Sequence, residues 1–301
     1  MSVLHELLNR KAVMNKLVFE SDYIEVDEKL RKQIQNALLG MLKDFDDVCS
    51  KHGISYFICG GSCLGAVRHK GFIPWDDDMD IAMTREEYVK FIRIFDMDMG
   101  DKYVLNAPNY SNNSITRFPK ILKKDSIYIT GDTSIPELQK LYIDIFIAEN
   151  IPDNHIARTI KGCMCNCLEF ISGQVIFFEN SSPTEREIYK KNNALSYCIR
   201  CFVAKAFAWV GVSRLNNLID TIVQHNDNST KLCGFPTGRK HYFGEFLPRE
   251  ILQETIRVPF EDCSFPIPKN FHFYLKNLYG DYMRIPPEEK REKHLIKKCE
   301  L

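Results

Sequence analysis

Hydrophobic residues recur at helical spacing across residues 26–52, and Ile34, Leu38, Leu42 and Phe45 are among those that share one face. Gly53 follows this stripe, and glycine is the residue that most often ends a helix in the left-handed conformation. A short apolar run comes directly afterwards at residues 54–59. The pattern predicts a long helix that leads into a core strand.

Further along the chain the hydrophobic period changes several times. Thr84 and Glu87 have the spacing of a capping box, which predicts a helix running to about residue 97. Strands are predicted at residues 103–106, 115–122, 142–148, 256–260 and 263–267, helices at residues 156–178, 184–212, 213–225 and 271–279, and a strand or turn at residues 240–245. This order predicts an α/β (α+β) protein with a mixed sheet.

The predicted elements divide the chain into four parts. Residues 1–27 form an N-terminal lead-in, residues 28–154 the core, residues 155–230 a helical insertion, and residues 231–301 a C-terminal part that caps and completes the core. The insertion is rich in apolar residues and has two interpretations. Its helices either pack against one another, which is the preferred interpretation, or present a face to lipid or to a partner.

Four aspartates stand within five residues: Asp76, Asp77, Asp78 and Asp80. Asp78 and Asp80 alternate with apolar residues, and on a strand residues two apart point to the same face. Two carboxylates this close repel each other unless a cation lies between them. Oxygen ligands suit Mg²⁺ or Mn²⁺, and Mg²⁺ commonly binds substrate phosphate as well. The run predicts a divalent-metal site, with a solvated acidic turn as the alternative.

A glycine pair precedes these acids. The first apolar run ends in Gly60, Gly61 and Ser62, and a helix is predicted at residues 64–69. Free N–H groups at a helix N-terminus bind anions, and glycine lets a phosphate approach closely. On its own the tripeptide fits a plain turn equally well. Followed by a carboxylate pair, it predicts a site for phosphoryl or nucleotidyl transfer.

One more acid and two bases are predicted near this site. Asp144 is embedded in an apolar run, and a buried carboxylate is costly unless it is paired or binds a cation. We expect it beside Asp78 and Asp80, with a solvent-facing strand edge as the alternative. Arg117 and Lys120 are candidates for gripping a diphosphate, or else they form a solvated basic edge.

The overall charge excludes one class of partner. The 301 residues include 40 Lys and Arg and 40 Asp and Glu, so the formal net charge is zero. Proteins that bind nucleic-acid backbones are usually basic. The N-terminus lacks the pattern of a signal peptide, and no run of about twenty apolar residues predicts a spanning helix. These features predict a cytosolic protein with no nucleic-acid partner.

The 11 cysteines are expected to be reduced in that compartment. Cys163, Cys165 and Cys167, together with Cys198 and Cys201, offer thiolates that suit zinc. However, alternate positions on a helix point in different directions, and the turn residues of a zinc knuckle are missing. Buried free thiols are therefore preferred over a metal site.

The stretch from Gly60 to Ile81 resembles the signature of the LicD family. It reads Gly-Gly-Ser-x-Leu-Gly-Ala-x-Arg-His-x-Gly-Phe-Ile-Pro-Trp-Asp-Asp-Asp-x-Asp-Ile. A second stretch, residues 279–294, also resembles this family, so the likeness covers about residues 28–150 and 240–295. The family is a branch of the nucleotidyltransferase-fold superfamily that includes DNA polymerase β, and fukutin-related proteins share the module. The resemblance implies a nucleotidyltransferase (polymerase β-like) fold.

The resemblance also implies a reaction. Such proteins move phosphocholine or another phospho-alcohol from a CDP-alcohol donor, most often CDP-choline, to a hydroxyl of a cell-surface glycan such as lipopolysaccharide, teichoic acid or capsule. The acceptor is then a glycan or glycolipid, and a cytoplasmic enzyme would work at the inner face of the membrane. Two alternatives stay open: transfer of NMP from an NTP with release of pyrophosphate, and a nucleotide-binding module without turnover.

Specific roles are expected for the site residues. Asp78 and Asp80 bind the metal ion, Asp144 completes the site or takes the proton of the acceptor hydroxyl, and Asp76 supports a second ion. Trp75 stacks on cytosine, binds a quaternary ammonium or belongs simply to the core. Contacts with the donor are expected from Gly60, Gly61, Ser62, Arg68, Trp75 and Lys120.

Overall fold

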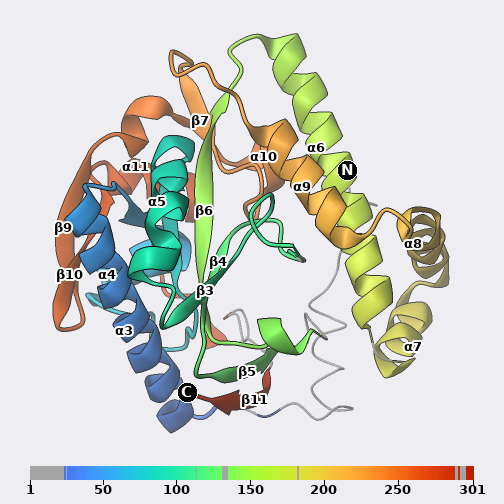
Figure 1. Ribbon diagram of the computed structural model, residues 1–301, viewed down its shortest axis with the longest axis horizontal. Coiled ribbons are helices and arrows are strands. Elements are labelled where there is room, and N and C mark those ends of the chain that lie inside the picture. The colour runs from blue at the N-terminus through green and yellow to red at the C-terminus, as the bar shows by residue number, and fades with distance from the viewer. Residues whose placement is uncertain are drawn as a thin grey trace.

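The computed structural model describes residue 24 and residues 26–112, 114–130, 135–181, 183–288, 291 and 296–301 (Figure 1). Most of the predicted lead-in, residues 1–27, therefore lies outside the described residues. The same holds for Lys290 and His294 of the second family-like stretch.

The first helix, α3 (Glu28–His52), agrees with the prediction to within two residues. The Asp27 side chain accepts a hydrogen bond of 2.7 Å from Leu30 N–H and caps the N-terminus. Gly53 ends the helix in the left-handed conformation, with a φ of +62°. The buried stripe packs against α5 (Arg85–Asp98), where the rings of Phe45 and Phe91 meet edge to face with centroids 5.1 Å apart.

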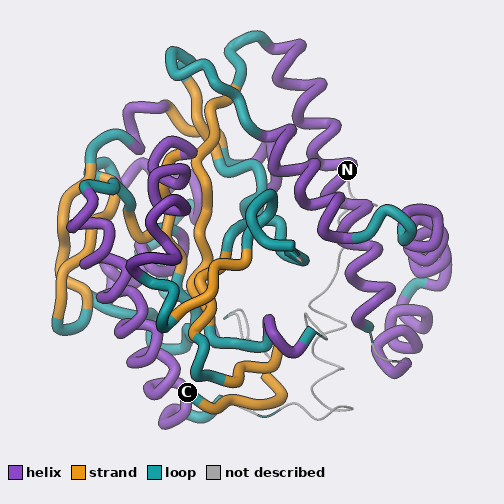
Figure 2. Tube along the Cα trace, in the orientation of Figure 1, coloured by secondary structure: helices purple, strands orange, loops and turns teal. Residues whose placement is uncertain are grey.

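The core is a mixed sheet of seven strands over the described residues (Figures 1 and 2). Its main path runs β1-β2-β6-β4-β3, and β7 and β8 extend the C-terminal end of β6. Only β2 and β6 pair in parallel among these described strands. The strands are β1 (Phe57–Ile58), β2 (Asp80–Thr84), β3 (Tyr103–Asn106), β4 (Lys120–Lys123), β6 (Tyr142–Ile151), β7 (Leu232–Gly234) and β8 (Phe246–Pro248).

Several strand boundaries differ from the prediction. β1 has two residues instead of the six of the apolar run. β4 begins at Lys120 rather than at residue 115, because Pro119 has no N–H to donate to a neighbouring strand. β6 continues beyond residue 148 because β7, a distant part of the chain, pairs with residues 149–151. β2 begins at Asp80, so Asp78 precedes the strand.

Half of the predicted capping box is present at the start of α5. The Thr84 hydroxyl accepts a hydrogen bond of 3.4 Å from Glu87 N–H. The Glu87 carboxylate, however, accepts from Ser55 N–H at 2.8 Å, just before β1. It therefore links α5 to the edge of the sheet instead of closing the reciprocal cap.

Four helices lie beside the sheet in the described part of residues 155–223 (Figure 1). They are α6 (His155–Asn180), α7 (Pro183–Asn192), α8 (Ala194–Phe207) and α9 (Val212–Val223). The prediction of one helix over 184–212 is wrong, because Asn193 interrupts it and caps α8 with a 2.9 Å bond from Ser196 N–H. Small apolar clusters join the helices, including Ile171, Val175, Val212 and Leu215.

In the described residues no single helix is long and apolar enough to cross a membrane. The helices α8 and α9 are long and apolar enough only when taken together, and they are bent by 89° where they meet. The five cysteines of this segment are free thiols. Cys165 is buried, but Cys163, Cys167 and Cys198 are exposed, so the expectation of buried thiols is wrong for these three. The helix turns them to different sides.

A buried charge cluster connects the helices to the sheet. Arg85, at the start of α5, donates from Nε to Glu149 Oε1 at 2.9 Å and from Nη2 to Asp220 Oδ1 at 2.7 Å. Glu149 is on β6 and Asp220 is on α9. Their side chains are 2% and 10% exposed, and that of Arg85 is 19% exposed. One buried cation thus holds two buried carboxylates from different layers.

The C-terminal part packs back onto the core. The predicted hairpin is present as β9 (Thr255–Phe260) and β10 (Cys263–Pro268), and α11 (Phe271–Tyr279) is capped by Asn270. The predicted strand or turn at 240–245 is the short helix α10 (His241–Gly244), where Tyr242 N–H bonds Asn166 on α6. The sequence pattern did not predict four further elements. They are β5 (Ile127–Thr130), its partner β11 (Ile296–Glu300), and the 3-10 turns η1 (Pro136–Leu138) and η2 (Arg249–Leu252).

Candidate active site

The glycine pair forms the first turn of α4 (Gly60–His69), which begins four residues earlier than predicted. Gly60 has a φ of +52°, and a methyl group there would lie 2.8 Å from Asp80 Oδ2. A methyl group at Gly61 would lie 3.0 Å from Asp76 Oδ2. The glycines therefore let two carboxylates approach the helix N-terminus, in addition to leaving room for a ligand.

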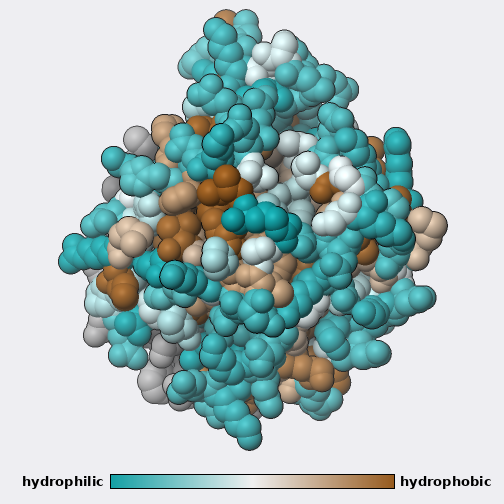
Figure 3. Space-filling model, turned by 90° about the vertical axis from the view of Figure 1, so that its left-hand side faces the viewer, coloured by the Kyte–Doolittle hydropathy of each residue, from teal (hydrophilic) through white to brown (hydrophobic). Residues whose placement is uncertain are grey.

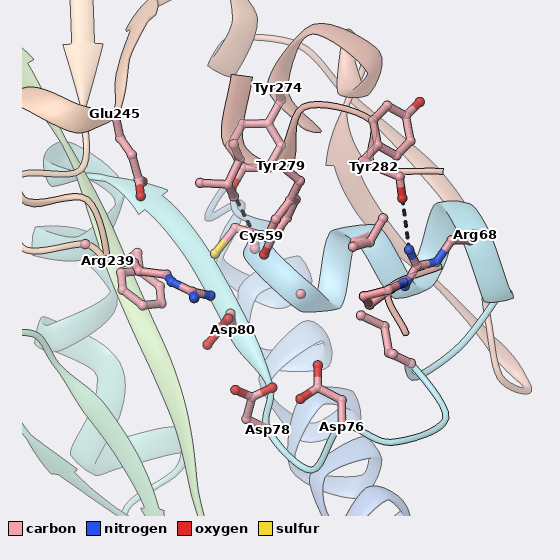
Figure 4. A pocket seen from close by; sticks show the side chains of 18 of the residues that line it. Cys59, Arg68, Asp76, Asp78, Asp80, Arg239, Glu245, Tyr274, Tyr279 and Tyr282 are labelled. Carbon is pink, nitrogen blue, oxygen red and sulfur yellow. Dashed lines mark hydrogen bonds between the residues drawn. The ribbon is translucent and has the colours of Figure 1, made fainter. Parts of the chain in front are cut away.

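Sheet register brings two predicted acids together. Asp80 on β2 is the parallel neighbour of Asp144 on β6, and Asp144 N–H donates to Met79 O at 3.0 Å. Asp78 precedes the strand, but the alternation holds, because Met79 is buried while Asp78 and Asp80 both line one pocket. Asp76 and Asp144 line the same pocket, whose volume is about 550 Å³ (Figure 4). The remaining aspartate, Asp77, is buried and accepts from the Tyr128 hydroxyl.

The electrostatic state of Asp80 reflects this crowding. Burial raises its pKa well above the ordinary value, and the charges of Asp78, Asp144 and Asp76 raise it further. The nearby Lys120 ammonium acts in the opposite direction. A cation among these oxygen atoms would relieve the repulsion.

The four predicted ligands fit a hard divalent cation. Their carboxylates line one pocket, and that of Asp80 is destabilised as an anion. Within the described ranges, no three carboxylate, histidine or cysteine side chains are arranged around a common point as preformed ligands. Binding of Mg²⁺ or Mn²⁺ by Asp76, Asp78, Asp80 and Asp144 therefore stays a prediction.

Three of the predicted donor-binding residues lie elsewhere than expected. Ser62 is buried and its Oγ accepts a 2.9 Å bond from Asp80 N–H, so the hydroxyl positions β2 rather than facing the pocket. Lys120 Nζ lies 2.7 Å from Asp144 Oδ1 and 3.4 Å from the centroid of Tyr142. Arg117 pairs with Glu169 at 3.4 Å and does not line this pocket.

Gly60, Gly61, Arg68 and Trp75 do line the pocket. The Arg68 guanidinium donates to Tyr282 O at 2.9 Å and lies 5.8 Å from the Trp75 centroid. The Arg291 guanidinium is 4.2 Å from the same ring. Two positive charges beside the indole make it a poor position for a quaternary ammonium and a better one for a base or phosphate.

A large part of the pocket wall was missed by the sequence analysis. It comes from the C-terminal part, where Tyr274 OH accepts a 3.0 Å bond from Gly60 N–H and holds α11 against α4. A signal for part of this wall was available in the family-like stretch 279–294. The unpredicted lining residues include Phe235, Arg239, Glu245, Tyr274, Tyr279 and Arg284.

Comparison with known proteins identifies the segment that carries the acids. Residues 53–162 match the family model described as LicD/FKTN/FKRP, nucleotidyltransferase domain. The glycine pair and the four aspartates of the proposed metal site fall inside this match, whereas a fifth lining aspartate, Asp281, lies outside it. The chain carries a LicD/FKTN/FKRP nucleotidyltransferase domain. The recognised resemblance to the LicD family is thereby confirmed.

A similar protein extends the likeness beyond that domain, and two others match shorter stretches. The lipopolysaccharide cholinephosphotransferase LicD of Haemophilus influenzae (strain Rd) is 27% identical over 282 residues, which cover 90% of this chain and 97% of that protein. An uncharacterized protein of Rickettsia typhi is 43% identical over 58 residues, 19% of each chain. One from Rickettsia prowazekii is 41% identical over 58 residues, 19% of this chain and 22% of that protein.

Proposed function

We propose that this protein is a metal-dependent phosphotransferase that moves a phospho-alcohol, phosphocholine above all, from a CDP-alcohol donor to a hydroxyl of a cell-surface glycan or glycolipid, such as lipopolysaccharide, teichoic acid or capsule. The observation that carries the proposal is one pocket that contains both the four carboxylates of the proposed metal site and several guanidinium groups. A relative over 90% of the chain that is named as a lipopolysaccharide cholinephosphotransferase supports the choice of substrates.

The donor diphosphate needs positive charge and free N–H groups. The amides of Gly61 and Ser62 belong to the first turn of α4, where N–H groups have no partner within the helix. Arg68 and Arg291 lie beside Trp75, so this end of the pocket suits the nucleotide. A divalent ion, Mg²⁺ or Mn²⁺, held by Asp76, Asp78, Asp80 and Asp144 would supply charge neutralisation at the transferred phosphate.

The transfer step requires a base and a leaving group. The acceptor hydroxyl oxygen attacks the phosphorus that bears the alcohol, and the bond from that phosphorus to the bridging oxygen breaks, so that CMP leaves. Asp144 is placed to take the hydroxyl proton, because it lies on the strand next to Asp80. Lys120, 2.7 Å from Asp144, positions this carboxylate and offsets negative charge.

The proposal extends to the fold and its division. We infer a polymerase β-like nucleotidyltransferase core at residues 28–154, a helical insertion at 155–230 and a C-terminal part at 231–301 that completes the site. In support, the parallel pair β2–β6 holds Asp80 beside Asp144, and the acids come from the matched segment while Arg239 and Arg291 come from the C-terminal part.

The proposal predicts metal-dependent release of CMP. Purified protein is mixed with CDP-choline, Mg²⁺ and a candidate glycan acceptor, and CMP and the modified glycan are measured with and without EDTA. We expect CMP only when metal and acceptor are both present. Pyrophosphate from an NTP, without CMP from any CDP-alcohol, would instead establish nucleotidyl transfer. Nucleotide binding without either product would establish a binding module.

We also propose that the helical segment brings the enzyme to the inner face of an anionic membrane, where a lipid-linked acceptor resides. On and just after α8, Leu195, Phe202 and Trp209 are 73%, 75% and 79% exposed. Residues 194–211 contain Arg200 and Lys205 but no acidic residue. Exposed large apolar side chains next to positive charge are typical of helices that lie on anionic lipid.

The opposite side of the molecule also exposes apolar surface. The face that carries β9 and β10 is mostly hydrophilic around a central apolar patch (Figure 3). Apolar side chains are thus exposed elsewhere too, and those on and just after α8 stand out through the basic residues beside them and the absence of acidic residues from 194–211.

The membrane proposal predicts that Phe202→Ser combined with Trp209→Ser lowers binding to vesicles of phosphatidylcholine and phosphatidylglycerol about tenfold or more, since each large side chain loses its transfer into the interface. Co-flotation measures the bound fraction. Met97→Ser is the control, because Met97 is 74% exposed on α5. Equal flotation of all variants would contradict the proposal.

A further inference from the structure

Glu245 is a buried carboxylate that the transfer step above does not use. It lines the pocket and is only 8% exposed. Its Oε1 accepts a 3.4 Å bond from Lys240 N–H, and the charges of Lys240, Arg239 and His241 act to lower its pKa. Burial raises the pKa of this carboxyl group. A buried acid that faces a cavity in this way is suited to bind a cation that enters from solution.

The wall around Glu245 is aromatic. Phe235, which is 3% exposed, and Tyr279 line the same pocket, as do Phe146 and Tyr274. Glu245 and Tyr279 line the same pocket from the two sides of Cys59 in the view of Figure 4. Aromatic faces attract cations, especially quaternary ammonium groups. The same rings provide few partners for the hydroxyls of a neutral polyol, which would lose hydrogen bonds to water on entering.

Charges alternate along this part of the pocket. Figure 4 shows Arg239 reaching between Glu245 and Asp80. The proposed metal site around Asp80 is therefore followed by the guanidinium of Arg239 and then by the carboxylate of Glu245. Phosphocholine carries charges of opposite sign as well, because a two-carbon chain separates its negative phosphate from its positive ammonium. With the phosphate near Asp80 and Arg239, the ammonium falls near Glu245.

Resting on the proposed function, we propose that Glu245, together with Phe235 and Tyr279, binds the positively charged end of the transferred alcohol. This subsite selects a choline-type donor over donors that carry a neutral polyol such as glycerol or ribitol. Trp75, which lies beside two guanidinium groups, serves the nucleotide end instead.

The test compares donors that differ only at the alcohol. Binding of CDP-choline, CDP-glycerol and CDP is measured by calorimetry with Mg²⁺ present, for the wild type and for Glu245→Gln. Glutamine keeps the acceptor for Lys240 N–H but removes the charge. We expect the affinity for CDP-choline to fall about tenfold or more, with CDP and CDP-glycerol unchanged. Glu254→Gln is the control, because Glu254 is exposed and pairs with Lys269 outside the pocket.

Each other outcome overturns the subsite. An equal loss for all three ligands would place Glu245 at the nucleotide, for example at the amino group of cytosine. No loss for any ligand would remove Glu245 from donor recognition. Tyr279→Leu provides a second variant that removes a ring face without touching the buried acid, and it must weaken CDP-choline selectively as well.

Binding and turnover separate this inference from the function on which it rests. If the selective loss of CDP-choline binding is found but no CMP is released, the subsite stands and the proposed reaction fails. If Glu245→Gln releases CMP from CDP-choline as efficiently as the wild type, the reaction stands and the subsite fails.

Discussion

Asp80→Asn is expected to abolish transfer and at the same time to make the metal-free protein more stable. The Asp80 carboxylate lies at the centre of the proposed metal site, so its loss should lower the rate of CMP release about a hundredfold to a thousandfold. In the metal-free protein the same carboxylate is buried and repelled by Asp78, Asp144 and Asp76. Asparagine relieves both penalties and should raise the melting temperature by about 2 °C or more.

The sign of this stability change depends on pH. The pKa of Asp80 is raised in the folded protein, so the unfolded chain gives up this proton more readily. The folded state is therefore penalised as the pH rises above the ordinary value of an aspartate, about 3.9. The gain from Asp80→Asn should be present at pH 7–8 in EDTA and should vanish toward about pH 4.

Melting curves at several pH values, with EDTA and with excess Mg²⁺, measure this effect. Asp101→Asn is the control, because Asp101 is an exposed aspartate outside the pocket. Excess Mg²⁺ should stabilise the wild type and not the Asp80 variant. A variant that melts below the wild type at pH 8 in EDTA would contradict our description of Asp80 as a strained anion.

Arg85→Met is expected to be the most destabilising single substitution considered for this protein. Arg85 is the cation between Glu149 and Asp220, and its removal leaves two carboxylates that are 2% and 10% exposed without that partner. Breaking a buried ion pair from one side costs about 3–5 kcal/mol of the free energy of unfolding. The loss should be greatest for the contact between the sheet and α9.

The pH dependence gives this prediction a clear signature. Burial already raises the pKa of Glu149, and the Arg85 charge opposes that rise, so without the guanidinium this pKa rises further and the folded protein favours protonation of Glu149. The destabilisation should therefore be larger at pH 8 than at pH 5. Denaturant unfolding at both values measures it, with Arg93→Met as the exposed control on α5.

A compensating variant tests the cause. Adding Glu149→Gln to Arg85→Met removes one of the two carboxylates that lose Arg85 as a partner. The double variant should recover part of the lost stability. If the double variant is no more stable than Arg85→Met, or if Arg93→Met is equally destabilised, the charge cluster does not carry the interaction that we assign to it.

The local elements could be predicted because their signals lie within one stretch of chain. α3 shows a repeated apolar period, a capping aspartate and a terminal glycine, and the structure has all three. Asp144 could be expected at the site because an acid inside an apolar strand needs a partner, and sheet pairing places it beside Asp80. Strands were likewise predicted at residues 256–260 and 263–267, and the structure pairs them as β9 and β10.

The rest depends on partners that are far away in the sequence. Lys120 and Ser62 were expected to contact phosphate, but tertiary contacts direct them to Asp144 and to the Asp80 amide. β11 has no alternation of its own and is a strand because β5 offers it an open edge. Nothing in the local pattern around Glu245 or Arg239 indicated that they would line the pocket.

The pocket draws its walls from two distant stretches of chain, and this separation has a consequence for synthesis. The glycine pair and the four aspartates of the proposed metal site lie before residue 150, whereas Arg239, Arg284 and Arg291 come from the last quarter of the chain. Chains fold from the N-terminus as they leave the ribosome. A nascent chain therefore holds an incomplete acidic site until α11 reaches α4 through the contact between Tyr274 and Gly60. On the proposed function, donor binding is therefore expected only after the C-terminal part has been synthesised.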